Sequence, residues 1–374
     1  MRILMCGRGY DGLGHRAVGN FEWDQARALK AAGHDVRFAA IDTRSLLHAR
    51  PLAYHSYELE GIPVYYASVP FQKLPFGLDV RPQEKAAAIV WRHIRKIGWR
   101  PEIIHCHFGG AFLVIARENG IPGVYTEHYS GSNTEDIAPE ELQRERETYP
   151  LANRVLCVSY PQAEMLRRHT GCECEVVHNI VDTAVFRPGT GERHEPFGFV
   201  ATGNLIHRKG FDLLLKAFAA LKEEEKSAST LTVIGGGEEE TNLRTLADSL
   251  GITERVRFLG RQPRELIAEE YLHADAFALA SRLETFGVVY IEAMAAGLPV
   301  IATACRGPED FVDASNGILI PTENVPALTE AMRKMMRTRK NYRPEAISAS
   351  VRERFSPEAM TERLTGVYES LIHG

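Results

Sequence analysis

The sequence is poor in cysteine and has no long apolar segment. Only six of its 374 residues are cysteine, and no run of 18 apolar residues occurs. A membrane-spanning helix needs about 20 such residues, so none is predicted. The apolar run in the N-terminal MRILMCGRG is too short for a signal peptide. Most cysteines lie in apolar runs such as RVLCV, which is typical of buried thiols, and we expect a reducing, cytoplasmic environment.

The sequence also has no excess of positive charge. Its 44 Lys and Arg residues and 49 Asp and Glu residues give a net charge of −5. No nucleic-acid partner is therefore predicted from overall charge. The stretch WRHIRKIGWR at 91–100 is locally basic and aromatic. It is typical of a surface helix, and peripheral contact with an anionic lipid surface is the alternative.

The composition that remains is that of a globular protein. Hydrophobic residues make up 44% and charged residues 25%, and the length favours two domains. Short apolar runs alternate with helix-period segments, which predicts βαβ units and parallel sheets buried on both faces. Strands are expected at 3–6, 36–41, 102–108, 123–128, 154–159 and 174–179, then at 197–204, 231–237, 255–260, 276–280 and 299–303.

The break between the two series lies in a segment rich in turn residues. Residues 182–196 hold two prolines, two glycines and several charges, which is typical of a linker. We expect one doubly wound domain at 1–188 and a second at 189–356. The final stretch, 357–374, is predicted to be an amphipathic helix. In the first domain, residues 10–20, 43–85 and 129–145 are expected to be less regular.

Two glycine-rich loops follow predicted strands. Gly7, Gly9 and Gly12 match the GxGxxG pattern of dinucleotide sites, but Asp42 lies 30 residues beyond Gly12. A ribose-binding acid is expected about 20 residues on, so a glycine loop lining a ligand cleft is the better interpretation. The loop at 235–237 has three successive glycines. They would let the backbone pass close to a ligand, or they form a plain tight turn.

One stretch carries the chemical argument. Residues 281–303 read SRLETFGVVYIEAMAAGLPVIAT, and seven residues separate Glu284 from Glu292. Glu284 is expected in a loop before a helix, and Glu292 inside that helix. The free N–H groups of a helix start suit a diphosphate, and an acid can accept hydrogen bonds from ribose hydroxyls. Two ordinary surface acids are the alternative.

This stretch resembles the E-x7-E signature of retaining glycosyltransferase family 4. Further similar stretches follow in the family's order: GHDV at 33–36, VVHNIVDTAVFRP at 176–188, GNLIHRKGFDLLLKAF at 203–218, LTVIGGG at 231–237, RVRFLG at 255–260 and RGPEDFV at 306–312. The resemblance implies the α/β GT-B fold, in which two Rossmann-like, doubly wound parallel-sheet domains face each other across a cleft. It also implies an N-terminal acceptor domain, a C-terminal donor domain and a last helix that packs back on the first.

The resemblance assigns a donor site to the second domain. Glu292 corresponds to the acid that holds the donor ribose, and Glu284 to the acid at the donor sugar. Arg208 and Lys209 correspond to the pair that clamps the diphosphate and neutralises the leaving group. Backbone groups complete the predicted site, at Thr285, Phe286, Gly287, Gly203 and Arg261. No metal is expected, because no DxD cluster lies near these residues.

The resemblance assigns fewer residues to the first domain. His128, in YTEHYSG, corresponds to the family's active-site histidine, which faces the transferred sugar. His107 is a candidate for the acceptor side, and Gly12 or Gly14 for approach to the donor. The loop that carries these glycines is longer than the family's adjacent glycine pair.

The resemblance, with the residues that carry it, implies a retaining, metal-independent hexosyltransferase. It would transfer a hexose or amino sugar from a nucleotide-diphosphate sugar, most often a UDP-sugar in this family, to an acceptor hydroxyl. The predicted acceptor is a saccharide, such as a lipid-linked one in surface polysaccharide synthesis at the inner face of a membrane. No cofactor beyond the nucleotide-sugar is expected. A nucleotide-sugar epimerase and a non-catalytic nucleotide-sugar-binding protein are the alternatives.

Overall fold

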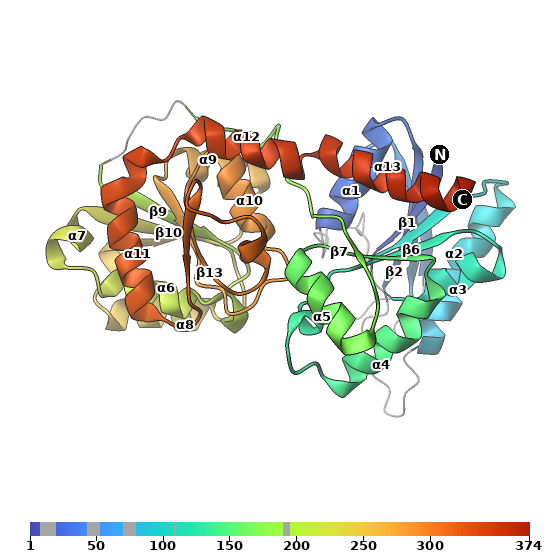
Figure 1. The fold of residues 1–374 in the computed structure, drawn as a ribbon, viewed down its shortest axis with the longest axis horizontal. Coiled ribbons are helices and arrows are strands. Elements are labelled where there is room, and N and C mark those ends of the chain that lie inside the picture. The colour runs from blue at the N-terminus through green and yellow to red at the C-terminus, as the bar shows by residue number, and fades with distance from the viewer. Residues whose placement is uncertain (8–19, 43–52, 70–79, 108, 190–194) are drawn as a thin grey trace. The chain divides into compact units, whose positions relative to one another are not determined.

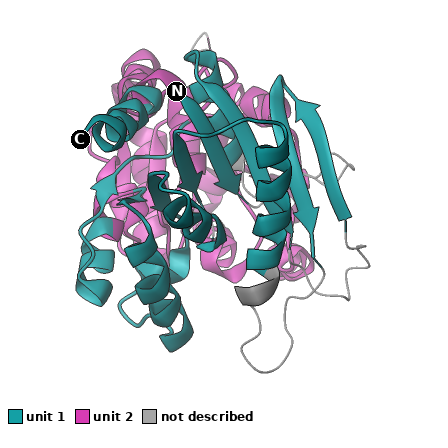
Figure 2. Ribbon diagram, turned by 90° about the vertical axis from the view of Figure 1, so that its right-hand side faces the viewer, with its two compact units in different colours: residues 1–158, 163–180, 360–374 teal, residues 159–162, 181–359 magenta. Residues whose placement is uncertain are grey.

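The computed structural model of the protein divides the chain into two compact units. It describes residues 1–7, 20–42, 53–69, 80–107, 109–189 and 195–374, so Gly12 and Gly14 lie outside the described residues. The first unit comprises Met1–Val158, Ala163–Ile180 and Met360–Gly374, and the second comprises Ser159–Gln162 and Val181–Ala359 (Figure 2). The chain thus leaves the first unit between Ile180 and Val181, and the described part of the expected linker is counted with the second unit.

The first unit is built on an eight-stranded sheet. Its strands are β1 (Arg2–Gly7), β2 (Asp35–Asp42), β3 (Ala53–Leu59), β4 (Ile62–Ser68), β5 (Ile103–Cys106), β6 (Gly123–Glu127), β7 (Arg154–Cys157) and β8 (Glu175–Val176). Their order is β3-β4-β2-β1-β5-β6-β7-β8, and every neighbouring pair is parallel except β3 and β4. The chain builds outward from β1 in one direction and then from β5 in the other. The switch point of this sheet therefore lies between β1 and β5, and sheets of this kind bind ligands beyond the carboxyl ends of the strands at that point.

The antiparallel strand β3 corrects the sequence analysis. Residues 43–85 were expected to be less regular, but β3 and β4 form a hairpin in which Leu59 pairs with Ile62. Glu60 and Gly61 make the turn with φ angles of 51° and 73°. Because β3 is a polar edge strand with several exposed residues, it lacks the continuous apolar run that marks the buried strands. The expectation for 129–145 was also wrong, since helix α4 starts at Pro139.

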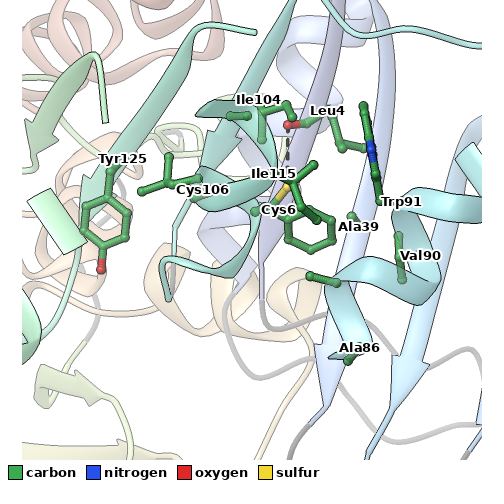
Figure 3. Packing of buried hydrophobic residues seen from close by; sticks show 14 of the residues in the cluster. Leu4, Cys6, Ala39, Ala86, Val90, Trp91, Ile104, Cys106, Ile115 and Tyr125 are labelled. Atoms are coloured by element: carbon green, nitrogen blue, oxygen red, sulfur yellow. Dashed lines mark hydrogen bonds between the residues drawn. The ribbon is translucent and has the colours of Figure 1, made fainter. Parts of the chain in front are cut away.

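Helices cover both faces of this sheet. They are α1 (Asn20–Ala31), α2 (Val80–Lys96), α3 (Ala111–Glu118), α4 (Pro139–Thr148), α5 (Tyr160–Thr170) and α13 (Pro357–His373). Successive strand residues point to opposite faces. Leu4 and Cys6 of β1 accordingly pack in one apolar cluster with α2 and α3 (Figure 3). Ile3 and Met5 pack in the opposite cluster with α1 and α13.

The last helix supplies part of the first unit's core. Met360, Leu364, Val367 and Tyr368 of α13 are buried in the same cluster as β1 and β2. The Tyr368 hydroxyl lies 2.6 Å from Nδ1 of His105, a fully buried residue of β5. Residues from Met360 onward thus belong structurally to the first unit although they come last in the chain (Figure 2).

The second unit contains a six-stranded parallel sheet (Figure 1). Its strands are β9 (Phe197–Thr202), β10 (Ser229–Ile234), β11 (Val256–Phe258), β12 (Ala276–Ala278), β13 (Val300–Thr303) and β14 (Gly317–Ile320). Its helices are α6 (Phe211–Ala219), α7 (Glu223–Ser227), α8 (Glu240–Ser249), α9 (Arg264–Leu272), α10 (Val288–Ala295), α11 (Val325–Thr338) and α12 (Pro344–Phe355). The order β11-β10-β9-β12-β13-β14 places the switch point between β9 and β12. Across both units, no described helix is long and apolar enough to cross a membrane.

Candidate functional site

Most of the predicted residues of the second unit follow the two strands at its switch point. Gly203 comes directly after β9, and a short 3-10 helix, His207–Lys209, then carries Arg208 and Lys209. Glu284 comes six residues after the end of β12, just before α10. Because the carboxyl ends of parallel strands share one edge of the sheet, residues distant in sequence meet there.

Glu284 is the centre of this group. Its carboxylate is almost fully buried, and Oε1 lies 2.6 Å from the Lys209 ammonium and 2.8 Å from the Ser281 hydroxyl. The Arg208 guanidinium approaches Oε2 to 3.9 Å and donates to the Leu283 carbonyl at 3.0 Å. Of the two cations, Arg208 keeps 35% of its side chain exposed and Lys209 13%. One buried negative charge is thus held by two partly exposed positive ones.

A helix begins immediately after this carboxylate. Gly287 is the N-cap of α10 with φ of +96°, and an added Cβ would lie 2.8 Å from the Tyr290 ring. Glycine is therefore required there on steric grounds. Phe286 packs its ring against Phe311 and Phe355 in the core, so that only its backbone could serve a ligand. The free N–H groups of a helix N-terminus favour an anion.

Glu292 is the fifth residue of α10 and is also nearly buried. Its Oε1 is 3.9 Å from Nε of Arg264, at the start of α9. Burial, and then the negative charge of Glu292, raise the pKa of the Tyr271 phenol well above its usual value. Glu292 therefore occupies a polar position beside a phenol that stays neutral.

The glycine loop at 235–237 has a structural role that the sequence left open. An added Cβ on Gly235 would lie 1.8 Å from the Gly203 carbonyl oxygen, and one on Gly237 would lie 2.3 Å from that of Leu205. These glycines admit the backbone that follows β9. Arg261, which is exposed, donates to the Asn204 side chain at 3.4 Å and flanks the same loop.

Arg282 supports the cations and was not predicted. Its guanidinium donates to both carboxylate oxygens of Asp212, at 2.8 and 3.0 Å, and to the His207 carbonyl at 2.6 Å. Its backbone N–H donates to the Arg208 carbonyl at 2.8 Å. Arg282 thus fixes the short helix that carries Arg208 and Lys209. In the sequence, the position of Arg282 in SRLETFG, two residues before Glu284, was the feature that could have indicated this role.

The first unit brings its two predicted histidines together. His107 follows β5 and His128 follows β6, and Nδ1 of His107 lies 2.9 Å from Nε2 of His128. The Phe21 ring lies 4.3 Å from the His128 ring, centre to centre. A contact between two ring nitrogens needs one protonated and one bare nitrogen. Each imidazole therefore orients the other and constrains its protonation.

A buried carboxylate that sequence reasoning missed holds the His128 segment. Oε1 of Glu127 accepts the backbone N–H groups of His128 and Tyr129 at 2.9 and 2.7 Å. Oε2 accepts from Arg144 at 3.1 Å, from Tyr149 at 3.0 Å and from Tyr125 at 3.4 Å. Adjacency to His128 was the only sequence signal, because Arg144 and Tyr149 are distant in the chain.

The same cluster contains a carboxyl group that titrates near neutrality. Glu145 is fully buried in α4, one residue from Arg144. Burial, reinforced by the negative charge of Glu127, raises the pKa of Glu145 to about 7. Burial and Glu127 likewise raise the pKa of the Tyr149 phenol. This part of the first unit is a closed polar core rather than a set of exposed charges.

The structure thus assembles two separate sets of predicted residues. Arg208, Lys209 and Glu284 are in contact in the second unit, whereas His107 and His128 are in contact in the first. Within the described parts of the chain, no three His, Cys, Asp or Glu side chains are grouped so as to hold a metal ion.

Comparisons with known proteins identify the family. The model described as "Glycosyltransferase Family 4" matches residues 18–185, and that described as "Glycosyl transferases group 1" matches residues 182–354. A D-inositol 3-phosphate glycosyltransferase from Mycobacterium leprae is 30% identical over 297 residues, which cover 72% of this chain and 69% of that protein. The chain belongs to the family of glycosyltransferases that these two models describe. D-inositol 3-phosphate glycosyltransferase 1 from Catenulispora acidiphila is 29% identical over an alignment that covers 73% of each protein.

Solved structures establish the fold type of this glycosyltransferase. Sucrose-phosphate synthase from Thermosynechococcus elongatus superposes with a TM-score of 0.81 at 21% identity, over 100% of both chains. Anabaena HepE in complex with UDP gives a TM-score of 0.75 at 19% identity, over 99% of this chain and 100% of that one. The two parallel-sheet α/β units are therefore those of a GT-B glycosyltransferase.

Among the sequence relatives, the alignment with the D-inositol 3-phosphate glycosyltransferase of Mycobacteroides abscessus covers only 58% of that protein.

Proposed function

We propose that this glycosyltransferase transfers a hexose or amino sugar from a nucleotide-diphosphate sugar to an acceptor hydroxyl with retention of configuration. The observation that carries the proposal is the group formed by Arg208, Lys209 and Glu284 beside the N-terminus of α10. Two cations and a helix start favour a diphosphate. A buried carboxylate beside them is suited to accept hydrogen bonds from sugar hydroxyls.

The proposed chemistry uses these charges as the glycosidic bond to phosphate breaks. Negative charge develops on the leaving diphosphate, where Arg208 and Lys209 stabilise it. Lys209 is paired with Glu284, and this ion pair holds the ammonium in position beside the carboxylate. The leaving phosphate oxygen accepts the acceptor's proton during same-face attack, and no covalent enzyme intermediate is proposed.

Glu292 in the second unit and His128 in the first have further proposed roles. Glu292 would accept hydrogen bonds from the donor ribose, a role suited to a carboxylate placed within α10. His128 would face the transferred sugar, with its ring direction set by His107 and its backbone by Glu127. The backbone amides around Thr285 and Gly287 would face the diphosphate.

A nucleotide panel provides the first test. Thermal unfolding of the full chain would be followed with UDP, GDP and ADP, and then with sugars on the nucleotide that binds. A ligand at 100 times its dissociation constant stabilises by about 2.7 kcal/mol, which shifts the transition measurably. UDP is the nucleotide we expect. No shift with any of the three would contradict a nucleoside-diphosphate site.

Product analysis provides the second test. NMR of the glycoside should show the donor's anomeric configuration retained, and transfer should survive EDTA. An inverted product excludes the proposed mechanism. Activity that EDTA abolishes and a divalent cation restores contradicts metal independence. Conversion of the donor sugar to an isomer without any acceptor would instead identify an epimerase.

The acceptor panel should cover two chemistries. The curated relatives are named for D-inositol 3-phosphate, so a phosphorylated cyclitol belongs in it. A lipid-linked saccharide, as expected in surface polysaccharide synthesis, is the other. We propose a saccharide or polyol hydroxyl as the acceptor, and the panel decides between them.

The end of α2 supports a peripheral membrane contact for the same enzyme. Arg92, Arg95 and Lys96 are exposed there, and the following Ile97 is 55% exposed. Cations beside an exposed apolar side chain suit an anionic lipid surface. Flotation with anionic vesicles should fall when these three cations are changed to glutamate. Equal flotation of both forms would contradict the contact.

A further inference from the structure

Two cysteines of the first unit lie close enough to react with each other. Cys157 is the last residue of β7, and Cys174 directly precedes β8, which pairs with β7 in parallel. Their sulfur atoms are 3.2 Å apart and are joined by a hydrogen bond. A disulfide requires about 2.05 Å between sulfurs, so an approach of little more than an ångström would form the bond.

A second pair of cysteines in the same sheet provides an internal contrast. Cys6 and Cys106 are in register on β1 and β5, and both are buried in the core. Burial raises the pKa of Cys6 well above its usual value, which keeps it a thiol. Neither is accessible to an oxidant in solution. This pair is expected to be inert.

Cys174 differs from that pair in exposure and in acidity. It is only partly buried, at the last-strand edge of the sheet, whereas Cys157 beneath it is fully buried. The hydrogen bond with Cys157 lowers the pKa of Cys174. Burial instead raises the pKa of the nearby Cys172 to about 11. Cys174 therefore forms the reactive thiolate more readily than Cys172, and it is more accessible than the fully buried Cys157.

We propose that Cys157 and Cys174 form a reversible disulfide, with Cys174 as the thiol that meets the oxidant. Hydrogen peroxide converts the Cys174 thiolate to a sulfenic acid, and with one proton the second peroxide oxygen leaves as water. The Cys157 thiol then attacks that sulfur, the S–OH bond breaks, and the hydroxide leaves with the thiol proton as a second water. An external dithiol reverses the bond by exchange.

The bond would close a loop that contains α5. Sixteen residues separate Cys157 from Cys174, and α5 (Tyr160–Thr170) lies among them. Cross-linking the ends of such a segment restricts the unfolded chain and stabilises the folded one. The chain leaves the first unit only six residues after Cys174, at Ile180. The crossing between Ile180 and Val181 lies outside the closed loop, so the bond restrains α5 and not the crossing itself.

Peptide mapping of the full chain tests the proposal. The reduced protein is treated with one equivalent of hydrogen peroxide, remaining thiols are alkylated, and the protein is digested with trypsin without reduction. Cleavage after Arg154, Arg167 and Arg168 places Cys157 in peptide 155–167 and both Cys172 and Cys174 in peptide 169–193. We expect these two peptides joined, with a loss of two hydrogen masses. Recovery of both peptides as alkylated monomers would overturn the proposal.

Matched variants identify the partner. Cys172→Ser should retain the cross-link, and Cys174→Ser should abolish it, because only Cys174 lies against Cys157. A Cys172–Cys174 bond within one peptide, or loss of the cross-link in Cys172→Ser, would overturn the assignment. Cys6 and Cys106 should be alkylated only after unfolding. Oxidation should raise the Tm of the wild type by a few degrees but not that of Cys174→Ser. No donor or acceptor enters this test, so its outcome is independent of the proposed function.

Discussion

The two units place a buried carboxylate at equivalent edges of their sheets but surround it differently. In the first unit Glu127 is 1% exposed and accepts five hydrogen bonds from backbone, phenol and guanidinium groups. In the second unit Glu284 is 5% exposed but is held by cations that reach solvent. The first arrangement fixes backbone, whereas the second leaves charges that a ligand can share. Glu127 therefore holds the backbone that carries His128 in place, whereas Glu284 belongs to the proposed binding site itself.

Removing a cation of the second unit should have the largest effect on activity. Lys209→Ala deletes a charge proposed to stabilise the leaving diphosphate, so kcat/KM should fall by about 10²–10³-fold. Steady-state kinetics and circular dichroism together would separate lost chemistry from lost fold. Lys334→Ala, on the exposed face of α11, removes the same charge from the same unit and should leave kcat/KM near the wild-type value. Equal kcat/KM values for Lys209→Ala and Lys334→Ala would contradict the proposal that the cations beside Glu284 serve a ligand.

Changing the first unit's carboxylate should act mainly on stability. Glu127→Gln removes the charge that faces Arg144 while keeping an oxygen for the backbone amides. Arg144 keeps 32% of its side chain exposed, so the loss should be about 1.5–3 kcal/mol, the range for a hydrogen bond to a charged group, and urea unfolding would measure it. Glu141→Gln is the control, because Glu141 also pairs with Arg144, at 2.7 Å, but is 27% exposed. It should cost less than about 1 kcal/mol. An equal loss of unfolding free energy in both variants would show that the buried contacts of Glu127 add no more stability than the exposed pair of Glu141.

The pH dependence of stability should expose the closed core of the first unit. The pKa of Glu145 is raised to about 7 from an ordinary 4.5, so the folded chain holds a proton that the unfolded chain has released between these values. Its contribution to stability is therefore present at low pH and is lost as the pH rises from about 4.5 to about 7. In Glu145→Gln this loss should vanish, so that the variant gains on the order of 1–3 kcal/mol over wild type between pH 5 and pH 8. Urea unfolding of both proteins at pH 5 and pH 8 measures the difference. The same change in unfolding free energy with pH in both would contradict the raised pKa of Glu145.

The smallest effect should come from the contact between α13 and β5. Tyr368→Phe removes the hydroxyl 2.6 Å from His105 and should cost about 1 kcal/mol of unfolding free energy. Burial lowers the pKa of His105 to about 3, so the imidazole stays neutral and its contribution is lost as the pH falls below about 6.5. Tyr160→Phe, on a phenol that is 59% exposed, should change the unfolding free energy little. A matching loss in both variants would remove the case for the buried contact.

The sequence predicted most of the parallel strands and singled out Arg208, Lys209 and Glu284, but it did not predict the parallel strands β4 and β14 or the residues that support these side chains. Strands such as β1 and β13 are buried on both faces, so their continuous apolar runs identify them. The edge strand β3 is partly exposed and carries the polar residues His55 and Ser56. The pattern of apolar residues therefore did not predict a strand there. Glu127 could not be predicted as an anchor, because its partners Arg144 and Tyr149 meet it only through the packing of α4 on the sheet.

The late position of α13 sets the order in which the enzyme can mature on the ribosome. The first unit's core includes Met360, Leu364 and Tyr368, which are synthesised after every residue of the second unit. Domains generally fold as their residues emerge, so the second unit can finish first although it comes second in the chain. A chain released or cleaved before residue 360 would keep a complete second unit and an uncovered apolar face on the first. Such a fragment is prone to aggregation rather than to partial activity.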